Sequence, residues 1–149
     1  MRGVSLVCAA MLGVATPGAL DAREDEAAPV RALLDAQVAA WNRGDLEGFM
    51  AGYWRSPELV FCSGATVTKG WEATLERYRK RYQAEGREMG QLRFESLEVE
   101  RLGPDAAFAR GEYWLRLGDG QQPHGRFTLV LRRLPGAWRI VHDHTSAAE

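Results

Sequence analysis

The sequence contains very little cysteine. Of its 149 residues only Cys8 and Cys62 are cysteines. Cys8 lies in an apolar N-terminal segment that we expect to be removed, which would leave Cys62 without a partner. We therefore expect no internal disulfide, and we interpret Cys62 as a small buried apolar residue rather than a nucleophile. Stability must then come from a packed core.

The chain also lacks a surplus of charge of either sign. It has 19 basic and 20 acidic residues and a formal net charge of -1. Removing residues 1–22 would take away Arg2 and Asp21 and leave this balance unchanged. A protein without a strong positive field has little to attract a polyanion. We therefore expect no nucleic-acid partner and no binding to an anionic membrane surface.

Long hydrophobic runs are missing as well. The most apolar stretch runs from Val4 to Ala15 and is interrupted by Ser5 and Gly13. This is shorter than the roughly 20 residues that a spanning helix requires, so no membrane span is expected.

The same N-terminal stretch has the pattern of a secretory signal peptide. Arg2 precedes the apolar run, and small residues follow it. We predict a signal peptide over residues 1–22, with cleavage after Ala22 or, alternatively, after Ala19. Residues 23–28 would then form a flexible mature N-terminus, and the protein would be secreted or periplasmic. The other interpretation is an ordinary buried N-terminal helix.

The sequence shows no serine nucleophile elbow, glycine-rich phosphate loop, zinc-binding helix motif or dinucleotide fingerprint. We therefore expect neither a cofactor nor a metal. With 46% hydrophobic and 26% charged residues, the chain has the composition of one folded domain. No linker or internal repeat divides it.

The order of the predicted elements indicates an α+β fold. Apolar residues at helical spacing predict a helix from Pro29, a second after the N-cap candidate Asp45, and a third from Gly70. Strands are predicted at 59–62 and 65–68, and four longer ones at 91–102, 106–117, 125–134 and 137–146, separated by glycine and proline turns. The three helices would cover one face of a mostly antiparallel sheet, leaving room for a ligand cavity.

A basic cluster lies on the third predicted helix. It comprises Arg77, Arg79, Lys80 and Arg81. We interpret the cluster as a solvated helix face, the alternative being an anion-binding or nucleic-acid patch.

Four motifs together resemble a known family. They are A-W-N-R-G-D at 40–45, K-G-W-E at 69–72, G-R-F-T-L-V-L-R-R at 125–133 and W-R-I-V-H-D-H-T-S at 138–146. In this order they resemble the SnoaL-like branch of the nuclear transport factor 2-like superfamily. Within it, the likeness is to small bacterial proteins of unassigned function and to the association domain of calcium/calmodulin-dependent kinase II. The resemblance covers residues 29–146.

The resemblance implies a cone-shaped α+β barrel, in which three N-terminal helices pack into a strongly curved, mostly antiparallel sheet. It also implies a homodimer formed through that sheet. The association domain has arginines in its pocket, but this chain has Thr145 and Leu129 at two of those positions and Glu112 near a third. The resemblance therefore does not support an anion pocket of that kind.

The last predicted strand contains two histidines around an aspartate. Alternate residues of a strand face opposite ways, so His142 and His144 share one face and Asp143 and Thr145 the other. The histidines suggest either two metal ligands or, as we prefer, hydrogen-bonded residues on a sheet face. We predict that Asp143 faces the cavity, where loss of hydration would suit it to acid/base chemistry.

We expect the remaining candidates to form walls of the same cavity, although most aromatic residues of such a chain are plain core. Glu112 has two open interpretations, as part of a pocket wall or of a solvated or dimer-facing surface, and Arg126 shares this ambiguity. The candidate catalytic residues are Asp143, Glu112 and Tyr78. The candidate substrate-binding residues are Tyr53, Trp54, Trp71, Trp114, Arg126, Leu129 and Thr145.

We therefore expect an exported domain that binds a small apolar or amphipathic molecule. It would act as a cofactor-free isomerase, dehydratase or cyclase with a buried carboxylate. The alternative is a non-catalytic module for ligand binding or homo-oligomerisation.

Overall fold

The computed structural model describes residues 18–148, with side chains described from Glu26 onward. Residues 1–17 of the predicted signal peptide lie outside this range. The described part contains helices α1 (Gly18–Asn42), α2 (Leu46–Met50) and α3 (Trp71–Tyr82), a short 3-10 turn η1 (Ala84–Gly86) and six strands. The strands are β1 (Val60–Ser63), β2 (Thr66–Lys69), β3 (Gln91–Gly103), β4 (Ala106–Arg116), β5 (His124–Leu134) and β6 (Ala137–Ala147). No helix in the described range is both long and apolar enough to cross a membrane.

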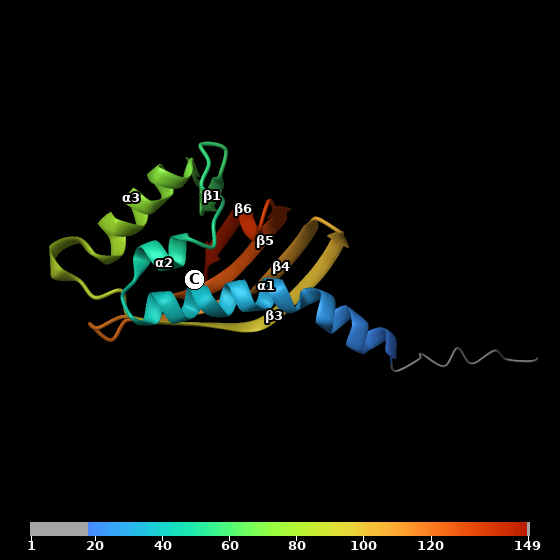
Figure 1. The fold of residues 1–149 in the computed structure, drawn as a ribbon. Helices are drawn as coiled ribbons and strands as arrows, with labels where there is room; N and C mark the ends of the chain where they lie inside the picture. Colours follow the sequence, from blue (N-terminus) through green and yellow to red (C-terminus); the bar gives the residue numbers. More distant parts are fainter. Residues whose placement is uncertain (1–17, 149) are drawn as a thin grey trace, which may run out of the picture.

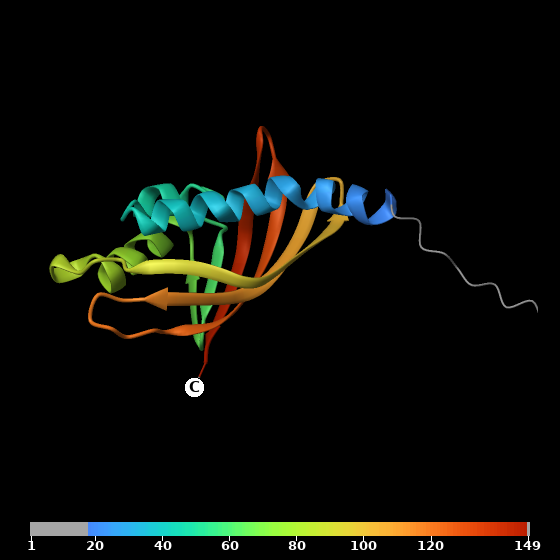
Figure 2. The same ribbon diagram turned by 90° about the horizontal axis from the view of Figure 1, so that it is seen from below.

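The six strands form one mixed sheet in the order β2-β1-β6-β5-β4-β3. All neighbouring pairs are antiparallel except β1 and β6, which run parallel. The helix α1 crosses one face of this sheet, with α2 and α3 beside its C-terminal end (Figures 1 and 2). The predicted α+β architecture is confirmed, and each strand begins and ends within one residue of its predicted bounds.

The first helix differs from its prediction. It begins at Gly18, so Pro29 lies inside it rather than in its first turn. The residues ahead of Pro29 are mostly alanines and charged residues, several of which are good helix formers. Ala27 and Val30 are both buried, so packing holds the helix on either side of the proline.

The second helix is short because its ends are fixed locally. Asp45 caps it by accepting a 2.7 Å hydrogen bond from the Gly48 N–H, as the sequence predicts. Gly44, with φ of 78°, reverses the chain between α1 and this cap. Leu46, Phe49 and Met50 fill the core beneath it.

Three register shifts interrupt the pairing of the long strands, one of them between Arg101 and Gly103 near the end of β3. In β6, Val130 pairs with His142 while Leu131 pairs with Ile140, which leaves Val141 unpaired. In β3 a register shift falls between Glu95 and Glu98, where Ser96 has a φ of 52°. A bulge bends its strand and changes which residues face the core. The inward residues of β6 are therefore Trp138 and Ile140 before the bulge and Asp143 after it.

Candidate functional site

A cavity of about 410 Å³ lies between the helices and the inner face of the sheet. Aromatic residues are the largest group in its walls, and its lining contains a single acidic residue, Asp143. The aromatic lining residues are Trp41, Phe49, Tyr53, Phe61, Tyr78, Tyr82, Phe94, Tyr113 and Phe127.

Asp143 is placed by the sheet. Its neighbours on the adjacent strands are Phe61 on β1 and Leu129 on β5, and both line the cavity with it. The carboxyl group is buried, with 4% of the residue exposed. It therefore lies among apolar side chains that offer it little solvation.

Tyr53 is placed over Asp143 by a backbone tether between the end of α2 and β6. The Ile140 N–H donates to the Gly52 carbonyl at 2.9 Å, and the Trp54 N–H donates to the Ile140 carbonyl at 2.9 Å. This tether joins β6 one residue before the bulge at Val141. The Tyr53 hydroxyl then donates a 2.7 Å hydrogen bond to Asp143 Oδ2.

The second carboxyl oxygen, Asp143 Oδ1, is buried and has no hydrogen-bond partner among the described residues. A buried polar atom left unpaired costs on the order of 1–3 kcal/mol. Since Asp143 lines the cavity, a ligand there can supply the missing partner.

Burial sets the protonation of this group. It raises the pKa of the Asp143 carboxyl from 3.8 to about 7, and the hydrogen bond from Tyr53 offsets only part of that rise. Burial also raises the pKa of Tyr53 and of Tyr78 well above 10.0, and the neighbouring Asp143 charge adds to both shifts. At neutral pH the tyrosines are therefore protonated, and Asp143 is divided between its two forms.

Tyr78 reaches the same cavity from α3. Its ring stacks on Phe61 with centroids 5.4 Å apart and meets the edge of Phe49 at 5.5 Å. Leu129 and Thr145, predicted as binding residues, also line the cavity. The Thr145 hydroxyl donates to the Cys62 carbonyl at 3.3 Å.

Five of the other candidates do not line this cavity. Glu112, Trp114 and Arg126 occupy the opposite face of the sheet, where Glu112 and Arg126 form a 3.4 Å ion pair and Trp114 stacks on His124 at 4.2 Å. Trp71 is buried, and its indole N–H donates to the Met50 carbonyl.

Trp54 does not line the cavity either. Glu112 and Trp114 face outward for a simple reason: on β4 the inward residues are the odd-numbered ones, including Ala107, Ala109 and Leu115. A strand in which charges alternate with an aromatic on one face fits either side of a sheet, so the sequence did not decide between them.

The two histidines of β6 also lie away from the cavity. His142 pairs with Val130 and His144 with Thr128 on the outer face, and His144 is exposed. Within residues 26–148 no group of three or more histidine, cysteine or acidic side chains is arranged to hold a metal ion. Cys62, expected to be buried, is half-buried beside His144.

The sequence interpretation missed Phe49 and Phe127 as cavity walls and Arg77 and Arg81 as lining residues. The sequence does contain a signal for the two arginines. Arg77 and Arg81 are four residues apart on one helix, and each directly precedes a tyrosine of the predicted inward face.

A larger groove of about 760 Å³ lies between α1 and the turn joining β5 to β6. Arg101, Arg133 and Arg139 line it, but no acidic side chain does. The aromatic cavity is therefore the stronger candidate for acid/base chemistry.

Comparisons with known proteins agree with this architecture. The family model described as SnoaL-like domain matches residues 30–149. A solved structure of an NTF-2 like protein of unknown function from Shewanella oneidensis MR-1 is 35% identical, with a TM-score of 0.74 over 83% of this chain and 98% of that one. A cystatin-like fold protein from Burkholderia xenovorans LB400 is 27% identical, with a TM-score of 0.64 over 83% of this chain and 92% of that one.

A nuclear transport factor 2 (NTF2-like) superfamily protein from Salmonella enterica is similar in fold. It is 20% identical, with a TM-score of 0.67 over 85% of this chain and 93% of that one. No curated protein matches the sequence.

Proposed function

Because this chain belongs to the SnoaL-like domain family, whose fold hosts many unrelated activities, we propose its function from the cavity itself. The protein binds a small, largely apolar or amphipathic molecule there. It acts on that molecule as a cofactor-free isomerase, dehydratase or cyclase. One observation carries the proposal: the buried Asp143 carboxyl lines an aromatic cavity with one oxygen held by Tyr53 and the other free for a ligand.

The chemistry follows from the protonation of this group. A carboxyl with a pKa of about 7 both accepts and returns a proton at neutral pH. The Tyr53 hydroxyl fixes the orientation of Oδ2 and leaves Oδ1 as the atom that exchanges the proton. Isomerisation, dehydration and cyclisation all need such a transfer, and none of them requires a cofactor.

The proposal includes the shape and setting of the domain. The helices and the curved sheet form a cone-shaped barrel around the cavity, and the chain is exported after loss of residues 1–22. Two copies pair through the outer face of the sheet, where no helix within residues 18–148 covers the half-buried Phe108 and Val130. The second candidate function rests on this same face: a non-catalytic module that binds a ligand or assembles subunits.

To test the proposal, the full chain is expressed in a bacterium that can export it, and the purified protein is analysed for a copurified small molecule. Mass spectrometry of the recovered protein identifies this molecule and reports whether residues 1–22 have been removed. Incubation of the molecule with fresh protein then shows whether it is converted. Asp143→Asn keeps the shape of the side chain and the acceptor for Tyr53 but cannot accept the proton. We expect it to retain the ligand and to lose conversion by a factor of about 10²–10⁴.

Glu112→Gln is the matched control, because it neutralises a carboxylate on the other face of the sheet. It should convert the molecule at the wild-type rate. Recovery of the ligand chemically unchanged from the wild-type protein would favour the non-catalytic module. Equal losses in the two variants would remove Asp143 from its proposed role.

A further inference from the structure

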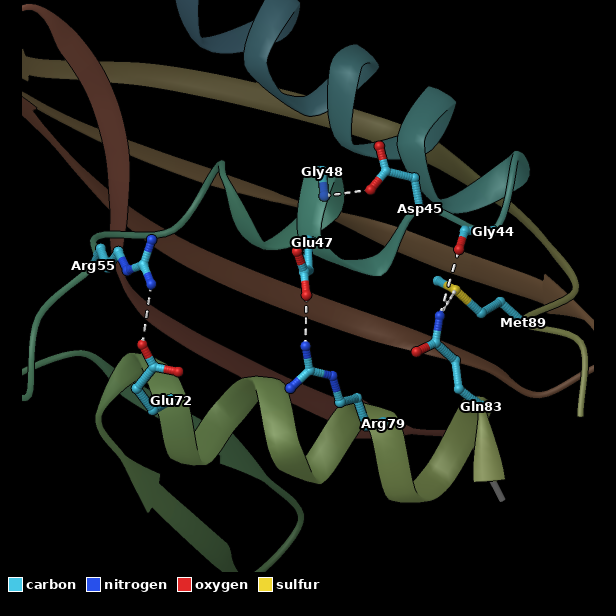
Figure 3. A network of polar contacts seen from close by, with 9 residues as sticks. All are labelled: Gly44, Asp45, Glu47, Gly48, Arg55, Glu72, Arg79, Gln83 and Met89. Atoms are coloured by element: carbon cyan, nitrogen blue, oxygen red, sulfur yellow. Dashed lines mark hydrogen bonds and ion pairs between the residues drawn. The ribbon is translucent and has the colours of Figure 1, made fainter. Parts of the chain in front are cut away.

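The basic cluster on α3 divides into two pairs. Arg79 forms an ion pair with Glu47 at 2.6 Å, shown in Figure 3, and Lys80 forms one with Glu76 at 3.7 Å. Arg77 and Arg81 form no ion pair with any acidic side chain of the described residues. Arg79 and Lys80 therefore belong to a solvated, ion-paired face of the helix, whereas Arg77 and Arg81 have no such acidic partner among the described residues.

The two unpaired arginines lie on the side of α3 that faces the cavity. They are four residues apart, which places them on one face of the helix, and both line the cavity. The Arg77 guanidinium lies over the Phe61 ring at 5.1 Å and donates to Thr68 Oγ1 at 2.9 Å. The Arg81 guanidinium lies over the Tyr82 ring at 5.6 Å.

These contacts position both guanidinium groups without neutralising them. Arg77 is half-buried and Arg81 is exposed, so they form the solvent side of the cavity, whereas Asp143 is buried. A guanidinium has five N–H donors, and the contact with Thr68 uses one of those on Arg77. The site thus has unused positive donors at its rim and a single carboxyl group inside.

We infer that the ligand of this cavity carries one anionic group, a carboxylate, sulfate or phosphate, which Arg77 and Arg81 bind at the rim. Its apolar body lies between Phe61, Tyr78 and Tyr82, with its inner end directed towards Asp143. The inference rests on the proposed function because it uses the same cavity, but it does not require catalysis. It narrows the ligand class from apolar or amphipathic molecules to amphipathic anions.

Two probes of nearly equal shape test the inference. 1-Naphthylacetate carries a carboxylate, whereas 1-naphthylacetamide is its neutral counterpart. Titration calorimetry of the full chain at low salt measures the Kd of each. We expect the wild-type protein to bind the acid about tenfold more tightly, since hydrogen bonds between charged groups exceed neutral ones in strength. The double substitution Arg77→Gln and Arg81→Gln should abolish this preference and leave the affinity for the amide unchanged.

The double substitution Arg79→Gln and Lys80→Gln is the matched control, because it removes the same net charge from the same helix outside the cavity. It should keep the tenfold preference for the acid. If this variant loses the preference as well, the overall electrostatic field of the helix rather than a local site is responsible, and the inference is overturned. Thermal unfolding verifies that each variant is folded. If the variant with both Arg77→Gln and Arg81→Gln does not fold, the single substitution Arg81→Gln is tested in its place. Equal binding of acid and amide by the wild-type protein would overturn the inference while leaving the cavity as a binding site. Failure of both probes to bind would count against the inference and the proposed function together.

Discussion

Asp143 combines two properties at the scale of a single residue. It is buried between apolar neighbours on β1 and β5, and it keeps one oxygen without a partner among the described residues. The groups that face it are the hydroxyls of Tyr53 and Tyr78, whose own pKa values are raised well above 10.0. Neither can neutralise a carboxylate, so the pKa of Asp143 stays raised in the folded protein.

This preference predicts how stability depends on pH. The pKa of Asp143 is 3.8 ordinarily and about 7 in the folded state. The folded state therefore binds the proton more tightly, and this contribution is complete below the unfolded-state pKa and declines as the pH rises to 7. At about 1.4 kcal/mol for each pKa unit, the decline is on the order of 4 kcal/mol. About 3 kcal/mol of it falls above pH 5, and urea unfolding of the wild-type protein and of Asp143→Asn, measured between pH 5 and pH 8, should show that part.

The variant should lack this part of the decline, because its amide does not titrate. The difference in unfolding free energy between the two proteins should change across this window in favour of the variant as the pH rises. A constant difference would show that Asp143 is ionised throughout.

At the scale of elements, the bulges decide which side chains reach the cavity. Without the extra residue at Val141, the alternation that turns Ile140 inward would turn His142 inward as well and Asp143 outward. The bulge in β3 has the same effect, since Leu92 and Phe94 face inward before it and Leu97 and Val99 after it. Its partner strand carries Gly111 opposite this bulge.

Gly111 is predicted to be required by this bulge. A Cβ atom at this position would lie 2.9 Å from Phe127 Cζ and 3.0 Å from the Glu95 carbonyl oxygen. Gly111→Ala should therefore lower the free energy of unfolding by roughly 1–3 kcal/mol, as overpacking does. Urea unfolding at constant pH measures the change.

Gly118→Ala is the control, because the nearest atom to its Cβ would be Glu88 Oε2 at 3.9 Å. It should shift the unfolding free energy by less than about 0.5 kcal/mol. Equal effects of the two substitutions would contradict the role given to Gly111.

At the scale of the whole molecule, the sheet has two unlike faces. The inner face is covered by helices, while the outer face carries ion pairs such as Glu112 with Arg126 beside the half-buried apolar residues Phe108 and Val130. An uncovered sheet face of this composition fits the proposed subunit contact.

Sedimentation analysis tests the proposed dimer. Val130→Lys should shift the wild-type mass towards the monomer, since an interface tolerates an unpaired buried charge poorly. Ala73→Lys adds the same charge on the exposed side of α3 and should leave the mass unchanged. A wild-type protein that is monomeric at micromolar concentration would refute the dimer.

The sequence by itself determined the elements of this protein. Periodicity and turn residues gave the strands to within one residue, and Asp45 marked the start of α2. These signals are local, because alternation, caps and glycine turns act between residues close in the chain. The predicted start of α1 at Pro29 was wrong for the same reason. The local preference of proline for a first turn was overridden by the packing of Ala27 and Val30 on either side of it.

Only the tertiary structure decided which face of each strand points inward. Glu112, Trp114 and Arg126 follow an alternation compatible with either face, and the helices that cover one side settle the matter through contacts distant in sequence. The parallel pairing of β1 with β6 places Phe61 beside Asp143, and the folding of α3 over the cavity places Arg77 and Arg81 at its rim. Burial, and with it the raised pKa of Asp143, arises only when these distant segments exclude water together.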